Sequence, residues 1–420
     1  DLATMVENDY PYFQIRKIYL DAYTQTSTSI GDRYPDANAA LNSQINTGTL
    51  IVNYTGHGSP IQLAHEDIID VSIIRSWKNL NRLPLFVTAT CSFSRFDDVD
   101  LQSMKTIVSA GEEILLNPMG GGIGLLTTTR LVYASDNYVL NRAFYRYVFK
   151  KDYTGRLLRL GDIMRLTKNE AFYTGINRLN FTLLGDPSMV LAYPKENYIR
   201  IDSVYSEELI QSDTIRALDR VWVAGHYADH NENPLPYNGV QYVTVFDKAD
   251  TLTTLGNDPE SYPRNFAQRQ NIIFRGKVEV REGKFSFQFP VPKDIRYNMG
   301  RGKIVCYALD TYPQSYGGAY EGFWVGGVSQ HMVEDREGPR IRIFMNDTNF
   351  VEGGITDSNP RLLVKLYDAN GINATGIGIG HDISAILDND IRQLFVLNDY
   401  YQSDLNDFRS GSVIFPLTGL

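Results

Sequence analysis

The sequence contains little cysteine and tryptophan, no excess of positive charge and no long apolar run. Only two of its 420 residues are cysteine and three are tryptophan. Two cysteines cannot form a disulfide framework, which favours a bacterial over an animal extracellular protein. Lys and Arg number 40 against 49 Asp and Glu, a net charge of −9, so nucleic acid or an anionic membrane is not expected as the main partner. No segment approaches the roughly 20 apolar residues needed to span a bilayer.

The chain is nevertheless long and of ordinary globular composition. At 420 residues it exceeds a single compact core, so two to three domains are expected. With 43% apolar and 21% charged residues, extended disorder is not expected. Heptads and strong short repeats are missing. No signal peptide is visible in a chain that opens at Asp1, and we expect a fragment or a mature piece of a longer protein.

Residues 1–195 alternate apolar runs with helix-like stretches. Such buried runs separated by helices predict an α/β domain with a mainly parallel sheet covered on both faces. The expected strands are 15–23, 49–55, 84–90 and 120–129. The expected helices are 36–48, ending at Gly48, then 136–149 and 162–171, with a helical and loop-like segment at 65–83.

From residue 196 onward, alternating strands separated by polar turns predict β-sandwich modules of the Ig-like kind. We expect one module at 196–334 and a second, truncated one at 335–420. The strand-like runs include VWVAGHYAD, VQYVTVFDK, IIFRGKVEV, KFSFQFPVP, KIVCYALD, PRIRIFMND and RLLVKLYDA. Cys306 lies inside KIVCYALD, where a buried core position is expected and pairing with the other cysteine is not.

Two residues with reactive side chains directly follow two of the buried strands. His57 stands between Gly56 and Gly58 just after strand 49–55, and Cys91 comes just after strand 84–90. The loops at the carboxyl ends of strands form the functional crevice of an open α/β sheet. The two residues are 34 positions apart, about one strand-helix-strand unit, so their strands are expected to be neighbours. The histidine and the cysteine would then face each other.

This pair has the chemistry of a cysteine nucleophile and its base. The thiolate attacks, and an imidazole takes up its proton and later protonates a leaving amine. The backbone N–H groups of Gly58 and Cys91 would form an oxyanion hole. The residues alone leave open a plainer interpretation, in which Cys91 is a small buried residue and Gly-His-Gly an ordinary turn.

Three further residues are secondary candidates for the same site. Glu66 would orient the imidazole or a substrate group, although a carboxylate at a helix start is the alternative. Asp21, within the expected strand 15–23, is another possible orienting residue. Arg130 follows the third strand and would contact a substrate carboxylate, with a structural salt bridge as the alternative.

No metal site is predicted. Asp97, Asp98 and Asp100 suggest calcium only weakly, because three acids do not make a ligand set, and a solvated loop is expected. His226 and His230 have a spacing of four but fall on a predicted strand and turn, so metal binding is not expected there either.

An ordered series of motifs carries a family resemblance over residues 12–195. The motifs are YTGHG, LPLFVTATCSFSRFDD, GEEILL, GGGIGLLTTTRLVYA and NFTLLGDPSMVLAYP. In this order they resemble the gingipain-type cysteine peptidases, and more closely the sortases of the type IX secretion system of Bacteroidetes. The stretch FRGKVEVREGKFSFQFPVPKDIRYNMGRGKI is similar to the β region that follows the peptidase domain in those sortases. The larger N-terminal portion of the family has no counterpart in this sequence.

The resemblance implies a caspase-like peptidase domain with Cys91 as nucleophile and His57 as base and acid. No cofactor is predicted, and calcium, which some relatives of the gingipains bind, is the alternative. The resemblance also implies that the protein is exported to the cell surface and held there by an outer-membrane β-barrel partner. Its substrates would be the C-terminal sorting domains of secreted cargo proteins, with an amine of anionic lipopolysaccharide as acyl acceptor. Two alternatives remain: a general endopeptidase with Arg or Lys specificity, and a non-catalytic surface adhesin whose β modules bind.

Overall fold

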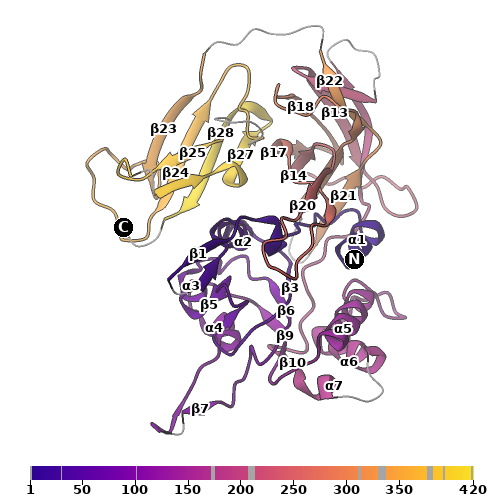
Figure 1. The fold of residues 1–420 in the computed structure, drawn as a ribbon. Coiled ribbons are helices and arrows are strands. Elements are labelled where there is room, and N and C mark those ends of the chain that lie inside the picture. The colour runs from indigo at the N-terminus through magenta and orange to yellow at the C-terminus, as the bar shows by residue number, and fades with distance from the viewer. Residues whose placement is uncertain are drawn as a thin grey trace. The chain divides into compact units, whose positions relative to one another are not determined.

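The structure is a computed structural model with two compact units (Figure 1). The first unit comprises residues 1–6, 17–192 and 253–265, and the second comprises 7–16, 193–252 and 266–420. The structure describes residues 2–29, 31–100, 102–171, 176–206, 213–310, 314–329, 337–375, 382–390, 393–417 and 420.

The first unit is built on a four-stranded sheet in the order β10-β9-β6-β3. The strands are β3 (Ile51–Thr55), β6 (Leu85–Ala89), β9 (Gly124–Thr128) and β10 (Phe181–Leu184). β3 pairs with β6, and β6 with β9, in parallel, which confirms three of the predicted strands and their direction. β10 pairs antiparallel with β9 and makes the sheet mixed, a strand that the sequence pattern did not predict. β6 and β9 are buried throughout, whereas β3 at the edge is only partly buried.

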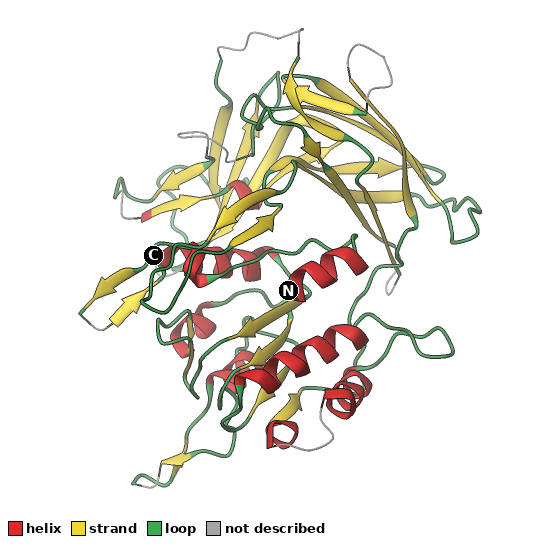
Figure 2. Cartoon of the chain, turned by 45° about the vertical axis from the view of Figure 1, so that its right-hand side comes forward, coloured by secondary structure: helices red, strands yellow, loops and turns green. Residues whose placement is uncertain are grey.

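Helices cover both faces of this sheet. Figure 1 shows α3 and α4 on one side and α5 and α6 on the other, and Figure 2 shows these helices in red around the sheet. The α-helices of the chain are α1 (Leu2–Asp9), α2 (Pro35–Thr47), α3 (Val71–Ser76), α4 (Ala110–Leu116), α5 (Ala134–Tyr147), α6 (Leu160–Ala171) and α7 (Ile176–Asn180), with 3-10 turns η1 (Leu20–Ala22) and η3 (Asn398–Tyr400). None of the helices in the described part of the chain is both long and apolar enough to cross a membrane.

Local signals account for the helix ends. α2 stops at Gly48, whose φ of 108° only glycine adopts readily, as its sequence predicted. α4 begins with a capping box in which Ser109 and Glu112 each bond the other's backbone N–H. Between α3, α4 and the sheet lies an apolar cluster that includes Ile74, Trp77, Phe86, Ile114 and Leu125.

One predicted element of this unit is wrong, and another is refined. Residues 15–23 form no strand: η1 interrupts them, and Ile18 and Leu20 pack on the apolar cluster without pairing to a sheet. The segment 65–83 is helical only in α3, because the Asp70 side chain accepts a hydrogen bond from Ile73 N–H and starts the helix there. The residues before Asp70 form the hairpin β4 (Gln62–Leu63) and β5 (Ile69–Asp70). Two further hairpins are β1 (Thr26–Thr28) with β2 (Gly31–Arg33), and β7 (Val99–Asp100) with β8 (Lys105–Thr106).

The described part of the second unit consists mainly of β-strands, in agreement with the predicted strands. Its sheets have the orders β11-β13-β18, β12-β22-β19 and β21-β20-β14-β17-β27-β28-β24-β23, and most pairs are antiparallel. The strands are β11 (Ile199–Ser206), β12 (Thr214–Ala217), β13 (Arg220–Tyr227), β14 (Gly239–Phe246), β15 (Asp250–Thr253), β16 (Asn265–Gln268), β17 (Ile272–Val280), β18 (Lys284–Pro290), β19 (Gly300–Arg301), β20 (Lys303–Leu309), β21 (Ser315–Tyr320), β22 (Trp324–Val328), β23 (Arg340–Met345), β24 (Arg361–Tyr367), β25 (Ser384–Ile386), β26 (Leu394–Val396), β27 (Tyr401–Leu405) and β28 (Asp407–Pro416). One core cluster lies among β11–β22 and a second among β24, β27 and β28.

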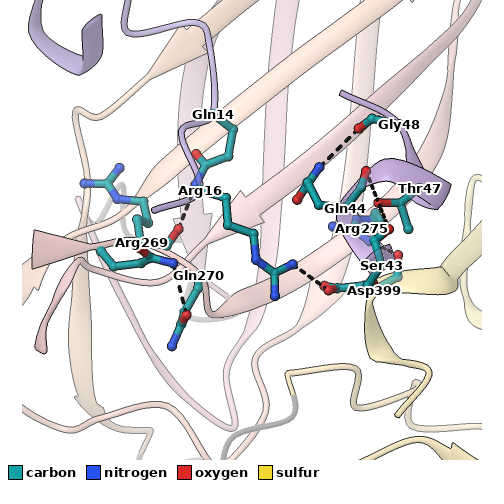
Figure 3. A network of polar contacts seen from close by, with 11 residues as sticks. Gln14, Arg16, Ser43, Gln44, Thr47, Gly48, Arg269, Gln270, Arg275 and Asp399 are labelled. Carbon is teal, nitrogen blue, oxygen red and sulfur yellow. Dashed lines mark hydrogen bonds and ion pairs between the residues drawn. The ribbon is translucent and has the colours of Figure 1, made fainter. Parts of the chain in front are cut away.

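Residues 7–16 belong to this second unit, and polar contacts hold them there. Gln14 donates a hydrogen bond of 2.7 Å to the carbonyl oxygen of Arg269, and Arg16 forms an ion pair of 2.8 Å with Asp399 (Figure 3). Arg275 in turn donates to the carbonyl oxygen of Asp399. These contacts tie the N-terminal segment to the turn between β16 and β17 and to η3, which Arg275 in turn links to β17.

Candidate functional site

The carboxyl ends of β3, β6 and β9 bring three of the predicted residues into one row. His57, Cys91 and Arg130 each lie two residues past the end of their strand. β3 and β6 are paired up to Thr55 and Ala89, so His57 and Cys91 continue from the same register position. The predicted neighbourhood of these strands is therefore confirmed. Both residues follow the sheet edge at which open α/β sheets carry their functional loops.

A close contact joins the loops that carry His57 and Cys91. A Cβ atom placed on Gly58 would lie 2.5 Å from Thr90 Oγ1 and 3.1 Å from Thr90 Cγ2. Thr90 is only 1% exposed, and its hydroxyl finds no hydrogen-bond partner among the described residues. The residue after His57 thus touches the residue before Cys91, and a side chain at position 58 has no room.

The backbone of His57 is held on one side by two hydrogen bonds. Its carbonyl oxygen accepts one from the Tyr54 hydroxyl at 2.6 Å and one from Ala64 N–H at 2.9 Å. Burial raises the pKa of Tyr54, which keeps its hydroxyl protonated and able to donate. The imidazole itself is exposed on a fixed backbone.

The backbone N–H groups of Gly58 and Cys91 lie outside the neighbouring hydrogen-bond ladders. Gly58 forms a β-bridge with Leu63. The bonds of that bridge run from Ala64 N–H to His57 and from Ser59 N–H to Gln62, so Gly58 N–H is not used in it.

The same holds for the loop after β6. Ser92 N–H donates to Arg130 and Ser94 N–H to Thr128, and Ser92 takes a left-handed φ of 52°. The N–H of Cys91 takes part in neither bond. In the described part of the chain, neither N–H group donates in the backbone hydrogen bonds of these two loops.

The two cysteines have very different surroundings. Cys91 is partly exposed, and its Sγ lies 3.7 Å from the carbonyl oxygen of Val132. Cys306 is 2% exposed within β20, and burial raises the pKa of its thiol to about 12. Its burial confirms that Cys306 is a core residue. Both cysteines are free thiols and do not pair with each other. Only Cys91 is placed for reaction with a solvent-borne group.

A second histidine, His65, lies against His57. The two rings are stacked, with centroids 5.2 Å apart and planes at 13°. The sequence pattern predicted a helical and loop-like segment at 65–83 and did not single out His65. The signal that would have found it is the turn chemistry of a hairpin between Gln62 and Asp70, which returns the chain to His57.

Glu66 lies in the same turn as His65 and is partly buried. It does not start a helix, because α3 begins only after Asp70. Its negative charge adds to burial in raising the pKa of Tyr54, the residue that donates to the His57 carbonyl. The structure therefore brings Glu66 near the base of the histidine loop, and its orienting role stays a prediction.

Asp21 is used elsewhere in the first unit. Its carboxylate accepts hydrogen bonds from the backbone N–H of Asn257 at 2.7 Å and of Gly256 at 3.1 Å, with Ser261 at 3.3 Å. Burial alone would raise the pKa of Asp21, but these bonds outweigh it and hold the pKa below its ordinary value. Asp21 thus anchors the segment 253–265.

Arg130 forms an ion pair with Asp97. Its two terminal nitrogens lie 3.0 and 2.6 Å from the two carboxylate oxygens, and both side chains are about half exposed. The bond from Arg130 lowers the pKa of Asp97. This geometry agrees with the alternative of a salt bridge, and it ties the loop after β6 to the loop after β9.

The acidic residues at 97–100, His226 on β13 and His230 in the turn after β13 all make other contacts. Asp98 pairs with Arg95, and Asp100 accepts from Ser103. His226 hydrogen-bonds Asp202 at 2.8 Å, and the His230 ring lies edge-on to Tyr198. Within the described ranges, no group of three or more His, Cys, Asp or Glu residues is arranged to hold a metal ion.

Comparison with known proteins gives a family match for the first unit. Residues 1–192 match the profile of Peptidase family C25. No curated protein sequence matches the chain.

Several solved structures are similar to parts of the chain. Dimeric latent PorU from Porphyromonas gingivalis is 28% identical over 66% of this chain and 26% of its own, with a TM-score of 0.35. The Arg-specific cysteine proteinase gingipain R (RgpB) is 15% identical over 66% and 55%, with a TM-score of 0.33. The complex of the P. gingivalis RgpB pro- and mature domains is 16% identical over 69% and 57%, with a TM-score of 0.32. The chain spans about a quarter of the PorU chain and just over half of the RgpB chains.

Proposed function

We propose that Cys91 is the nucleophile and His57 the general base and acid of a cysteine peptidase, because residues 1–192 match the profile of Peptidase family C25. The observation that carries the proposal is their placement two residues past the ends of the paired strands β3 and β6. The contact of Gly58 with Thr90 supports it, because it joins the two loops.

The first step is attack on a peptide carbonyl. His57 takes the thiol proton, and the Cys91 thiolate forms a bond to the carbonyl carbon while the π electrons move to oxygen. Two N–H groups, those of Gly58 and Cys91, lie outside the local ladders and would donate to that oxyanion. Each such donor typically contributes about 2.7–4 kcal/mol to stabilising the transition state.

The second step breaks the peptide bond and the third releases the product. The C–N bond cleaves, the leaving amine takes the proton from His57, and a thioester remains on Cys91. Water or a second amine then gives its proton to His57 and attacks the thioester carbonyl. The C–S bond breaks, and the thiol is restored. With water the product is an acid, and with an amine it is a new amide.

We further propose that the enzyme is a sortase of the PorU type. The ordered motifs from YTGHG to NFTLLGDPSMVLAYP support this substrate class. The substrates would be C-terminal sorting domains of secreted cargo, the acceptor an amine of lipopolysaccharide, and the partner an outer-membrane β-barrel at the cell surface. The first unit would have a caspase-like core, and the second would comprise Ig-like sandwich modules.

A thiol-reactive peptide probe tests the peptidase chemistry. We expect the native chain to be labelled at Cys91 much faster than a free model thiol at neutral pH. Cys91→Ala should abolish the labelling, and His57→Ala should slow it. Cys306→Ala serves as the matched control, since that thiol is buried. Labelling no faster than the model thiol, with no effect of His57→Ala, contradicts the proposal.

A second experiment separates the sortase from an endopeptidase of Arg or Lys specificity. Surface cargo from cells that carry Cys91→Ala in the full-length protein is analysed by mass spectrometry. A sortase requires that the sorting domains stay attached to the cargo in this variant. Their unchanged removal rejects the sortase and leaves the endopeptidase, which is then assayed on basic peptides.

A further inference from the structure

His65 is an exposed imidazole that the proposed chemistry does not use. Its ring lies parallel to that of His57 within 13°, with centroids 5.2 Å apart. Two exposed side chains normally sample several rotamers. Their stacking therefore depends on how firmly the backbone holds them. The turn that carries His65 is held firmly by buried flanks and by contacts with other elements.

The turn at residues 64–68 is a rigid support. Its flanks are buried: Leu63 is 0% and Ile68 2% exposed, while Ala64 within it is 4% exposed. Ile68 N–H closes the turn by donating to the carbonyl oxygen of Leu63. Ala64 and Asp67 both take left-handed φ angles, of 60° and 52°. A backbone held in such conformations is defined by its surroundings.

Side chains from other elements fix the same turn. Arg33 forms an ion pair of 2.5 Å with Asp67, and both side chains are mostly buried, at 22% and 25% exposure. Asn38, on α2, donates to the carbonyl oxygen of Ile68 at 2.9 Å. The backbone around His65 is thus tied to β2 and to α2, so little entropy remains to be lost when its ring stacks.

The turn is also bonded directly to the backbone of His57. Ala64, the residue before His65, donates its N–H to the His57 carbonyl oxygen at 2.9 Å. Beside it, Gly58 and Leu63 form the β-bridge. The two histidines therefore stand on one hydrogen-bonded frame, and the face of His57 that His65 covers is closed to other groups.

From this geometry we infer that His65 is a positioning residue, which stacks on His57 and restricts its imidazole to one ring plane. The inference rests on the proposed role of His57. Proton transfer demands a nitrogen within hydrogen-bond reach and in line with its partner, and misplacement by about 1 Å costs up to about 100-fold in rate. An exposed histidine without its stacking neighbour would spend much of its time in other orientations.

Substitution at position 65 tests the inference through the labelling rate of Cys91 and through peptide turnover. His65→Ala removes the stacking surface and should slow both by about tenfold, within the range that misplacement produces. The loss should fall on kcat more than on KM, since His65 is inferred to contact no substrate. His65→Phe keeps a flat ring and should retain most of the rate. The melting temperature should change little in either variant, because residue 65 is exposed.

His230→Ala is the matched control. It removes another exposed histidine whose ring also contacts an aromatic side chain, Tyr198, but in the second unit. It should leave the labelling rate unchanged. Equal rates for His65→Ala and His65→Phe overturn the positioning role, as does an unchanged rate in His65→Ala.

A readout that does not depend on activity separates this inference from the proposed function. In Cys91→Ala, the ring-proton NMR signals of His57 should carry the ring-current shift of a stacked neighbour, and His65→Ala should abolish it. If the wild-type chain does not react at Cys91 while the ring-current shift is present, the peptidase proposal fails and the positioning role fails with it. If Cys91 reacts and the shift is missing, only the inference about His65 is overturned.

Discussion

Gly58 and Thr90 meet so closely that a Cβ atom on Gly58 would lie 2.5 Å from the Thr90 hydroxyl oxygen. Real Cβ atoms essentially never come this near, so the loop after β3 and the residue before Cys91 fit only with glycine at position 58. Thr90 is buried and does not give way easily. The contact couples the two halves of the proposed site by packing alone.

Gly58→Ala should therefore lower the free energy of unfolding by about 1–3 kcal/mol, as overpacking typically does, and slow the labelling of Cys91. Thr90→Ala in the same chain should restore much of both, because it removes the hydroxyl and the methyl group that the new side chain at position 58 would meet. Thr90→Ser keeps the oxygen and should not restore them. Denaturant unfolding of the single and double variants measures the coupling. Additive effects contradict the contact.

The local stability of residues 255–257, which Asp21 holds by hydrogen bonds, should depend on pH. The pKa of Asp21 in the folded chain is held below the ordinary value by hydrogen bonds from residues 256 and 257. The ionised Asp21 carboxylate therefore contributes its full stabilisation of the folded chain above the ordinary carboxyl pKa of about 4. This contribution is lost as the pH falls through the lower pKa that Asp21 has in the folded chain. Hydrogen exchange of residues 255–257, corrected for its intrinsic pH dependence, should speed up only at acid pH. In Asp21→Asn this change should disappear, and equal profiles in both chains contradict the role of Asp21.

Substitution of Arg130 should change the pKa of Asp97 measurably. The hydrogen bond from Arg130 is the main cause of the lowered pKa of Asp97, so Arg130→Gln should return that pKa toward its ordinary value. Carboxyl-carbon NMR titration follows it directly. Arg165→Gln is the control, because Arg165 is exposed and faces Asp162 elsewhere in the first unit. A substrate role for Arg130 would instead appear as a higher KM with the Asp97 titration unchanged.

The two thiols should differ sharply toward a small alkylating agent. Cys306 is buried and its pKa is raised to about 12, so almost none of it is thiolate at neutral pH and the reagent does not reach it. The native chain should take up one label, at Cys91, and the unfolded chain two. Cys91→Ala should take up none until it unfolds. Labelling of native Cys306 at the rate of Cys91 would show that β20 opens readily.

Much of the fold follows from patterns a few residues long. The helix ending at Gly48 and the strands β6, β9, β13 and β17 are read directly from apolar periodicity and turn residues, because burial of one face and the conformational freedom of glycine act locally. The placement of His57 and Cys91 after neighbouring parallel strands also follows, since one helical crossover makes such strands neighbours.

Other features arise only when distant segments meet. The antiparallel β10 needs the exposed edge of β9, and Asp21 takes its partners about 235 residues later in the chain. The hairpin that presents His65 is stabilised by Arg33 and Asn38, outside any local window. Local sequence was therefore sufficient for the parallel strands β3, β6 and β9 and for the positions of His57 and Cys91 at the ends of their strands. The stacking of His65, the close contact at Gly58 and the anchoring role of Asp21 depend on packing between residues that the chain order keeps apart.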